Sequence, residues 1–141
     1  MSKIVVDTIN STLTFAGRTI EDTPEGDVFT IAYVNDVSSQ TQGVNGGVVA
    51  KARSDKFAAN LTVRVLKYSA DDAFLNNLVN SDLSLNQGSL KTNFTRDGVD
   101  GTETYDIQNG TIQTRGNTTV NNTDGEDVVE YGIFGNMPRS V

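Results

Sequence analysis

The side chains that could do chemistry in this chain are limited to carboxylates, amines, phenols and hydroxyls. Its 141 residues include no His and no Cys, which removes the commonest general base, the commonest zinc ligand and the thiolate nucleophile. The 18 acidic residues gather mainly at 21–27, 97–106 and 124–130. Carboxylates alone could build a calcium site or the paired acids of a glycoside hydrolase.

The cluster at 97–106 is the best calcium candidate. It offers oxygen ligands on Asp97, Asp100, Glu103 and Asp106, but it lacks the alternating acids before Gly that an EF-hand requires. A sugar cleft needs aromatic walls, and the chain has no Trp and only 4 Tyr. Nucleophile elbows, phosphate loops and dinucleotide fingerprints are absent from the sequence. We therefore expect no enzymatic activity, no catalytic residues, no cofactor and no metal.

The charge of the chain indicates which partners it could bind. A net charge of −7 argues against tight nucleic-acid binding, which needs several cations on phosphates, and is compatible with nucleic acid passing without adhering. A group of bases within an acidic protein marks contact with an acidic surface, including one on a second copy, and the alternative is a plain solvated face. The candidate intersubunit basic face consists of Lys51, Arg53, Lys56, Arg64 and Lys67.

Alternating apolar residues predict a chain built mainly of β-strands. The clearest strand is 56–66, in which Phe57, Ala59, Leu61, Val63 and Val65 share one face. "RSDK" at 53–56 predicts a tight turn that pairs this strand with 48–55. Further strands are expected at 11–20, 27–34, 89–95 and 128–137, the last with a bulge or close backbone approach at Gly132 and Gly135. The Asp-Gly and Asn-Gly pairs of 96–115 predict turns between short strands at Tyr105–Ile107 and around Ile112.

The period of the sequence changes after Lys67 and predicts a helix at about 70–80. Ser69 can cap its N-terminus, with Asp71 and Asp72 at the positive end of the helix dipole. At about eleven residues such a helix is marginal alone, so it must dock on a sheet. Its core-facing stripe is Phe74, Leu75, Leu78 and Val79.

A long polar segment at 35–47 follows the second predicted strand. Loops of this length in compact domains are usually functional or disordered, and two interpretations stay open: a floppy hairpin tip, or an arm that is ordered against another subunit. The candidate ring-stacking residues are Asn35, Asp36, Val37, Ser38, Ser39, Gln40, Thr41, Gln42, Gly43, Val44, Asn45 and Gly46.

The order of these features resembles the small tail tube proteins of contractile-tailed bacteriophages. The resemblance rests on residues 45–80, where glycines precede an alternating strand that ends in a capped helix; the matching positions are Gly46, Gly47, Ala52, Ser54, Leu61, Val63, Ser69, Leu75 and Leu78. Where that family often has Asn at the helix start, this chain has Asp71 and Asp72. Tube proteins of the Hcp kind in secretion systems share the fold.

The resemblance implies a mainly β fold, an antiparallel β-sandwich or partly closed barrel flanked by the short helix, in a single domain of residues 1–141. It also implies homohexameric rings that stack into a hollow tube conducting DNA into the host. The expected partners are other copies of the chain, a tail sheath protein, and baseplate or tail terminator proteins. The segment at 35–47, an N-terminal arm at about 1–10 and the C-terminal residues would make the stacking contacts.

The expected location is the virion tail, after assembly in the host bacterial cytoplasm. The N-terminus lacks the apolar run of a signal peptide, and the sequence offers no membrane anchor. Two alternatives remain open at this stage. One is a secretion-system tube; the other is a monomeric β-sandwich that decorates a virion or binds carbohydrate.

Overall fold

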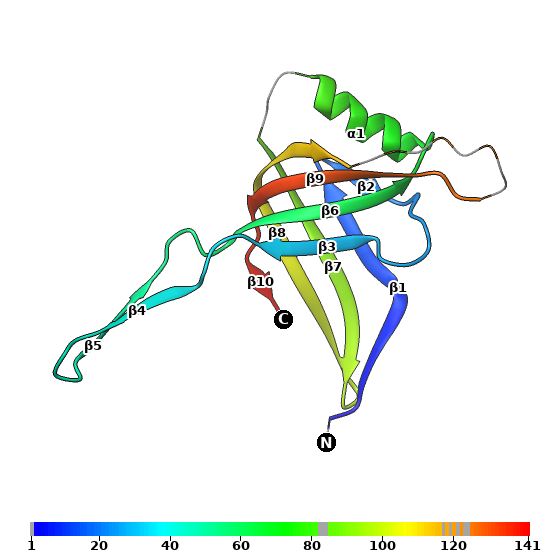
Figure 1. Ribbon diagram of the computed structural model, residues 1–141. Coiled ribbons are helices and arrows are strands. Elements are labelled where there is room, and N and C mark those ends of the chain that lie inside the picture. The colour runs from blue at the N-terminus through cyan, green and yellow to red at the C-terminus, as the bar shows by residue number, and fades with distance from the viewer. Residues whose placement is uncertain (1, 82–84, 117, 119, 121, 123–124) are drawn as a thin grey trace.

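The chain folds into one antiparallel sheet, a separate hairpin and a helix (Figure 1). The computed structural model describes residues 2–81, 85–116, 118, 120, 122 and 125–141, and for 7–10 the backbone only. The elements are β1 (Ile4–Phe15), β2 (Arg18–Ile20), β3 (Phe29–Tyr33), β4 (Ser38–Gln42), β5 (Val48–Ala52), β6 (Ala58–Leu66), α1 (Ala70–Asn80), β7 (Asn86–Arg96), β8 (Val99–Arg115), β9 (Val128–Asn136) and β10 (Arg139–Ser140). The predicted mainly β class with one flanking helix is confirmed for this part of the chain.

The sheet bends over itself into two layers. Its strand order is β2-β1-β7-β8-β9-β6-β3, and β10 adds to β8. The 17-residue β8 belongs to both layers, because β7 pairs with it over 99–110 whereas β9 pairs with it over 108–115. Strands β3, β6 and β9 then cross over β1, β7 and β8 (Figure 1). The end strands β2 and β3 do not pair with each other, so the barrel is only partly closed.

The core lies between the two layers, as the alternation of β6 predicted. Ala59, Leu61, Val63 and Val65 are fully buried, whereas Phe57, on the same predicted face, lies before β6 and is exposed. Large side chains from the layer of β1, β7 and β8 pack against them, namely Leu13, Phe15, Leu90 and Ile107. Strand β9 and the residue after it complete the cluster with Tyr131, Ile133 and Met137. Burial on this scale is the main favourable term for folding.

Strand β8 continues through Asn109-Gly110, where the sequence predicted a turn. The pair does not turn the chain: Asn109 takes a left-handed φ of 54° within the strand, and the pairing with β9 shifts register there. This is a bulge, which bends the strand from one layer into the other. The predicted close backbone approach is confirmed at Gly135, where a Cβ would lie 2.9 Å from the Gln108 carbonyl oxygen and 3.2 Å from Gly110 Cα.

Other predicted boundaries hold only in part. Asp97-Gly98 does form a tight turn, with φ of 51° and 80°, between β7 and β8. The expected strand at 11–20 is instead the last part of β1 from Ser11 to Phe15, a turn at Ala16-Gly17, and β2. Residues 4–6, expected in an N-terminal arm, pair with 94–96 of β7, which makes them part of the sheet.

Helix α1 begins as predicted. Ser69 Oγ accepts a hydrogen bond from the Asp72 N–H at 3.2 Å, and the Asp72 carboxylate accepts the Tyr68 N–H at 3.0 Å. Of the predicted stripe, Leu75 is fully buried, while Phe74, Leu78 and Val79 are partly buried against the core. The helix therefore covers one end of the two-layered core (Figure 1).

Asp71 joins this helix to the β2 end of the sheet. Its carboxylate is 1% exposed and accepts Arg18 Nε at 2.7 Å and the N–H groups of Glu21 and Asp22 at 2.8 Å each. Burial alone would raise the pKa of Asp71, but the two N–H groups and the guanidinium outweigh it and hold that pKa below its ordinary value. Sequence reasoning assigned Asp71 only to the helix dipole, because its partners lie about fifty residues away.

Replacing Asp71 with Asn should lower the free energy of unfolding at neutral pH by about 1–3 kcal/mol, because two N–H groups and a guanidinium lose their anion. Since the folded-state pKa is lowered, the stabilisation is present above the ordinary Asp pKa of about 4 and is lost as pH falls below it. Urea unfolding at pH 7 and pH 3 measures both effects. The wild type should lose more stability than the variant between these pH values; equal losses would contradict the assignment.

Candidate assembly surfaces

The predicted loop at 35–47 forms β4 and the tip of an arm that extends from the body (Figure 1). We define the arm as residues 36–53, which contain β4, a tip at 43–47 and β5. Strands β4 and β5 pair only with each other, and every residue in both is exposed. An isolated two-stranded hairpin is marginally stable in water. The arm therefore has little packing to stabilise it in the isolated subunit.

The strand pairing in the arm differs from the predicted one. Strand β5 pairs with β4, from Ser38 opposite Ala52 to Gln42 opposite Val48, and not with β6 as the "RSDK" turn suggested. At the tip, Gly46 takes a left-handed φ of 85°, and Val44 is fully exposed. The base is fixed by Asn35, whose side-chain amide donates to the Asp55 carbonyl at 3.1 Å.

The five bases of the predicted intersubunit face lie in two places. Lys51 is on the arm and Arg53 at its base, where Arg53 pairs with Asp55 at 3.0 Å; Lys56 lies over the Phe57 ring, 5.1 Å from its centroid. Near the other end of β6, Arg64 lies 3.5 Å from Glu130, and Lys67 packs over the Tyr68 ring. These five residues were grouped because they are close in sequence, but β6 separates them into two groups in the structure. Their intersubunit role stays a prediction.

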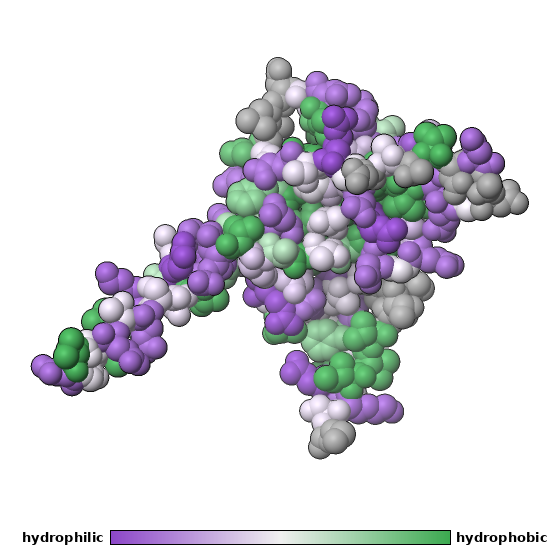
Figure 2. All heavy atoms as spheres, viewed as in Figure 1, coloured by the Kyte–Doolittle hydropathy of each residue, from purple (hydrophilic) through white to green (hydrophobic). Residues whose placement is uncertain are grey.

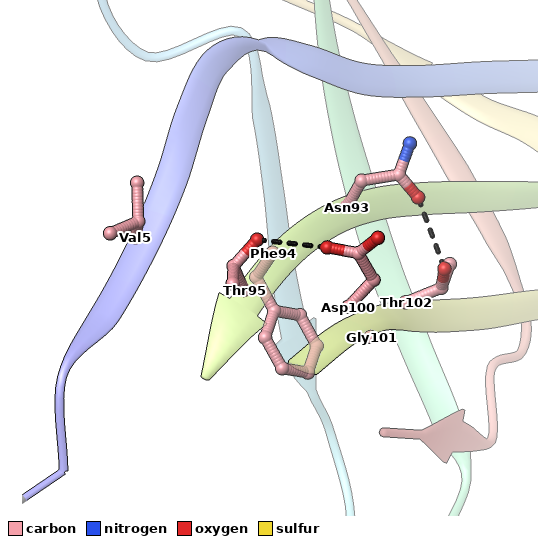
Figure 3. A pocket seen from close by; sticks show the side chains of 7 residues that line it. All are labelled: Val5, Asn93, Phe94, Thr95, Asp100, Gly101 and Thr102. Atoms are coloured by element: carbon pink, nitrogen blue, oxygen red, sulfur yellow. Dashed lines mark hydrogen bonds between the residues drawn. The ribbon is translucent and has the colours of Figure 1, made fainter. Parts of the chain in front are cut away.

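The ends of β1, β7 and β8 form a second projection, the tongue, which comprises residues 3–6 and 93–102. Its exposed apolar side chains gather at the lower end of Figure 2 and include Ile4, Val5, Val6 and Val99. The Phe94 ring leaves no room for a side chain at Gly101, since a Cβ there would lie 2.5 Å from it. Hydroxyl contacts cross the strands beside it, from Thr95 to Asp100 and from Thr102 to Asn93 (Figure 3).

A groove opens between the two end strands of the sheet, β2 and β3, which do not pair with each other. It has a volume of about 1290 Å³ and runs between β3 and the β1–β2 hairpin, with the segment 21–28 as one wall. Its floor includes Phe29, Ile31, Leu90 and Tyr105. Small-molecule pockets usually measure about 300–1,000 Å³. At about 1290 Å³ this groove exceeds that range.

The acidic clusters form no metal site in the described residues, where no three potential ligands gather to hold an ion. In the calcium candidate, Asp97 accepts the Lys3 N–H at 2.8 Å, and Glu103 pairs with Arg139 Nε at 2.6 Å. Asp124, from the third cluster, lies outside the described residues. Within the same part of the chain, no helix is long and apolar enough to span a membrane.

No protein-family model matches the chain, and no curated protein matches its sequence. Solved structures do match it in shape. A chain of the extracellular contractile injection system PVC, in its sheath–tube complex in the extended state, aligns with a TM-score of 0.66 and 11% identity over 96% of this chain and 91% of that one. The chain shares its fold with a protein of a contractile injection system's sheath–tube complex.

Two further cryo-EM structures contain chains with the same fold. One is the PVC sheath/tube terminator in the extended state, with a TM-score of 0.66 and 11% identity over 97% of each chain. The other is the anti-feeding prophage cap (AFP tube terminating cap), with a TM-score of 0.65 and 10% identity over 96% of this chain and 91% of that one. The fold thus extends over almost all of the 141 residues. The predicted resemblance to tail tube proteins is confirmed at the level of fold.

Proposed function

We propose that this chain is a structural subunit of the tube in a contractile phage tail or a related injection particle. The observation that carries the proposal is the match, over at least 96% of the chain, to proteins from a sheath–tube complex and from tube-terminating assemblies. In this proposal six copies form a ring, rings stack into a hollow tube, and the tube contacts sheath, baseplate and terminator proteins. Assembly takes place in the host bacterial cytoplasm, and the protein resides in the particle.

Three features of the isolated subunit support self-assembly. The sheet ends in the edge strands β2 and β3, which do not pair with each other, and open edges are normally covered because they offer free backbone hydrogen-bonding groups. The arm has no packed face of its own. The tongue exposes neighbouring apolar residues, as expected at interaction surfaces. A tube would cover all three with copies of the same chain.

The lumen wall is assigned to the face of β1, β7 and β8 that points away from the core. The register places Lys91 opposite Thr104, and Asn93 opposite Thr102, with core-side residues alternating between them. Asp100 and Asp106 add negative charge towards the two ends of this face, and Thr12, opposite Lys91, adds a hydroxyl. A polar face with few cations binds phosphates weakly. DNA could therefore pass along it without adhering.

Electron microscopy of the purified protein over a range of concentrations, with negative stain, tests the proposal. Hollow rings or stacked tubes are the expected result. A strictly monomeric particle by light scattering, at every salt concentration and with tail extract added, would contradict it and favour the monomeric decoration or carbohydrate-binding alternative.

A terminal position in the tube is a second candidate, favoured by the match over 97% of both chains to a protein of the sheath/tube terminator structure. Growth distinguishes the two positions. A tube subunit should polymerise into tubes whose length rises with concentration, whereas a terminator should stop at single rings and cap preformed tubes.

A further inference from the structure

The groove between β3 and the β1–β2 hairpin is chemically matched to one segment of the same chain. Its wall at 21–28 contains Glu21, Glu25 and Asp27, which are exposed. Among the described residues, none of these three carboxylates lies within ion-pair distance of a base. Of the apolar floor residues, Leu90 is buried and Phe29, Ile31 and Tyr105 are half-buried, and the rim is acidic. An occupant should therefore present apolar side chains together with a cation.

One face of the arm has this composition. Residues opposite one another in a hairpin share a face, so the pairs Thr41–Val49 and Ser39–Lys51 place Val49 and Lys51 side by side along β5. Val49 is 57% exposed, and in the described part of the chain no carboxylate lies within ion-pair distance of Lys51. This face offers an aliphatic contact, a cation and two hydroxyls.

The groove cannot receive the arm of its own subunit. The groove contacts the first half of β3, around Phe29 and Ile31, whereas the arm follows the opposite end of β3 after Tyr33. Figure 1 shows the arm extending away from the body at that end. Strand β3 pairs with β6 over its whole length, which fixes this direction. An arm in the groove must come from another copy.

We propose that the arm of a second copy occupies this groove, with Val49 over the floor and Lys51 against the carboxylates of Glu21, Glu25 and Asp27. The inference deepens the proposed tube function and rests on its self-assembly. It assigns one donor and one receptor surface to each subunit. Because the two surfaces differ, the contact is heterologous, and such contacts propagate from copy to copy into rings or open stacks.

Zero-length cross-linking of assembled protein tests the contact directly. Carbodiimide joins a Lys amine to a carboxylate as an amide with loss of water, and it acts only on groups already in contact. Tubes grown from equal amounts of ¹⁴N- and ¹⁵N-labelled protein should yield a mixed-isotope peptide pair that joins Lys51 to the segment 21–27. Tubes in which Lys51 joins other carboxylates, or none, would overturn the groove assignment and leave the tube function intact. Failure to form any assembly would overturn both.

Charge reversal tests whether the proposed contact between Lys51 and the groove carboxylates stabilises the assembly. Lys51→Glu places like charges together, which costs enough to raise the critical concentration for assembly by about tenfold or more. Combining it with Glu25→Lys should restore most of the loss. Arg115→Glu, an exposed change of equal charge near the far end of β8, is the matched control and should assemble normally. Unchanged assembly of the folded Lys51→Glu variant would contradict the proposal, as would the absence of rescue.

Discussion

A subunit in which residues 36–53 are replaced by two glycines is expected to fold normally and to form no stacked tubes. The strands of the arm pair only with each other, so their removal exposes no core residue. The remaining loop leaves the body at Val34, whose N–H donates to the Ala58 carbonyl at 3.1 Å, directly beyond the β3–β6 ladder. Its new ends are therefore close enough for a short connection.

Circular dichroism and thermal unfolding should show a transition within a few degrees of the wild type, and electron microscopy should show no tubes. The variant Gln40→Ala is a matched control, since it changes an exposed side chain on the arm face opposite Val49 and Lys51. This control should form tubes of normal appearance. Tubes from the glycine variant would mean that another surface stacks the rings.

The second prediction with a large expected effect concerns folding of the subunit. Leu75→Asp should prevent stable folding, because Leu75 is 0% exposed at the contact between α1 and the sheet. A carboxylate buried there without a partner costs several kcal/mol, which is comparable with the whole stability of a domain, about 5–15 kcal/mol. Phe74, the residue that leads the predicted stripe, is only partly buried, with Arg18 5.6 Å from its ring centroid. Leu75 is therefore the more sensitive position.

Two variants calibrate this result. Leu75→Ala should fold with a free energy of unfolding lower by about 2–5 kcal/mol. Asn77→Asp, on the exposed side of the same helix, should change stability by less than about 0.5 kcal/mol. A Leu75→Asp protein with a wild-type melting temperature would show that the helix does not cover the core.

The sequence predicted features that depend on neighbouring residues. The alternation of β6, the Ser69 cap and the Asp97-Gly98 turn all depend on contacts or conformations within a few positions, and the structure has each of them. The wrong predictions concern choices between local alternatives. Strand β5 could pair forwards or backwards along the chain, and Asn109-Gly110 could form a turn or a bulge. In both cases the outcome depends on packing between distant strands.

The candidate site was less predictable than the fold. The segment 35–46 was a candidate because it is long and polar, yet the sequence alone left a floppy tip and an ordered arm as alternatives. The groove could not be foreseen, since its walls come from β1, β2, β3, β7 and β8 and meet only after the sheet bends. The basic residues were grouped by sequence spacing, although β6 carries them to opposite ends of a strand.

The central claim is that copies of this chain build a hollow tube, and a cryo-EM reconstruction of the purified, concentrated protein tests it most directly. We expect stacked sixfold rings in which the polar face of β7 and β8 lines the lumen and each arm contacts a neighbouring copy. Monomers at every concentration, or filaments without a lumen, would contradict it.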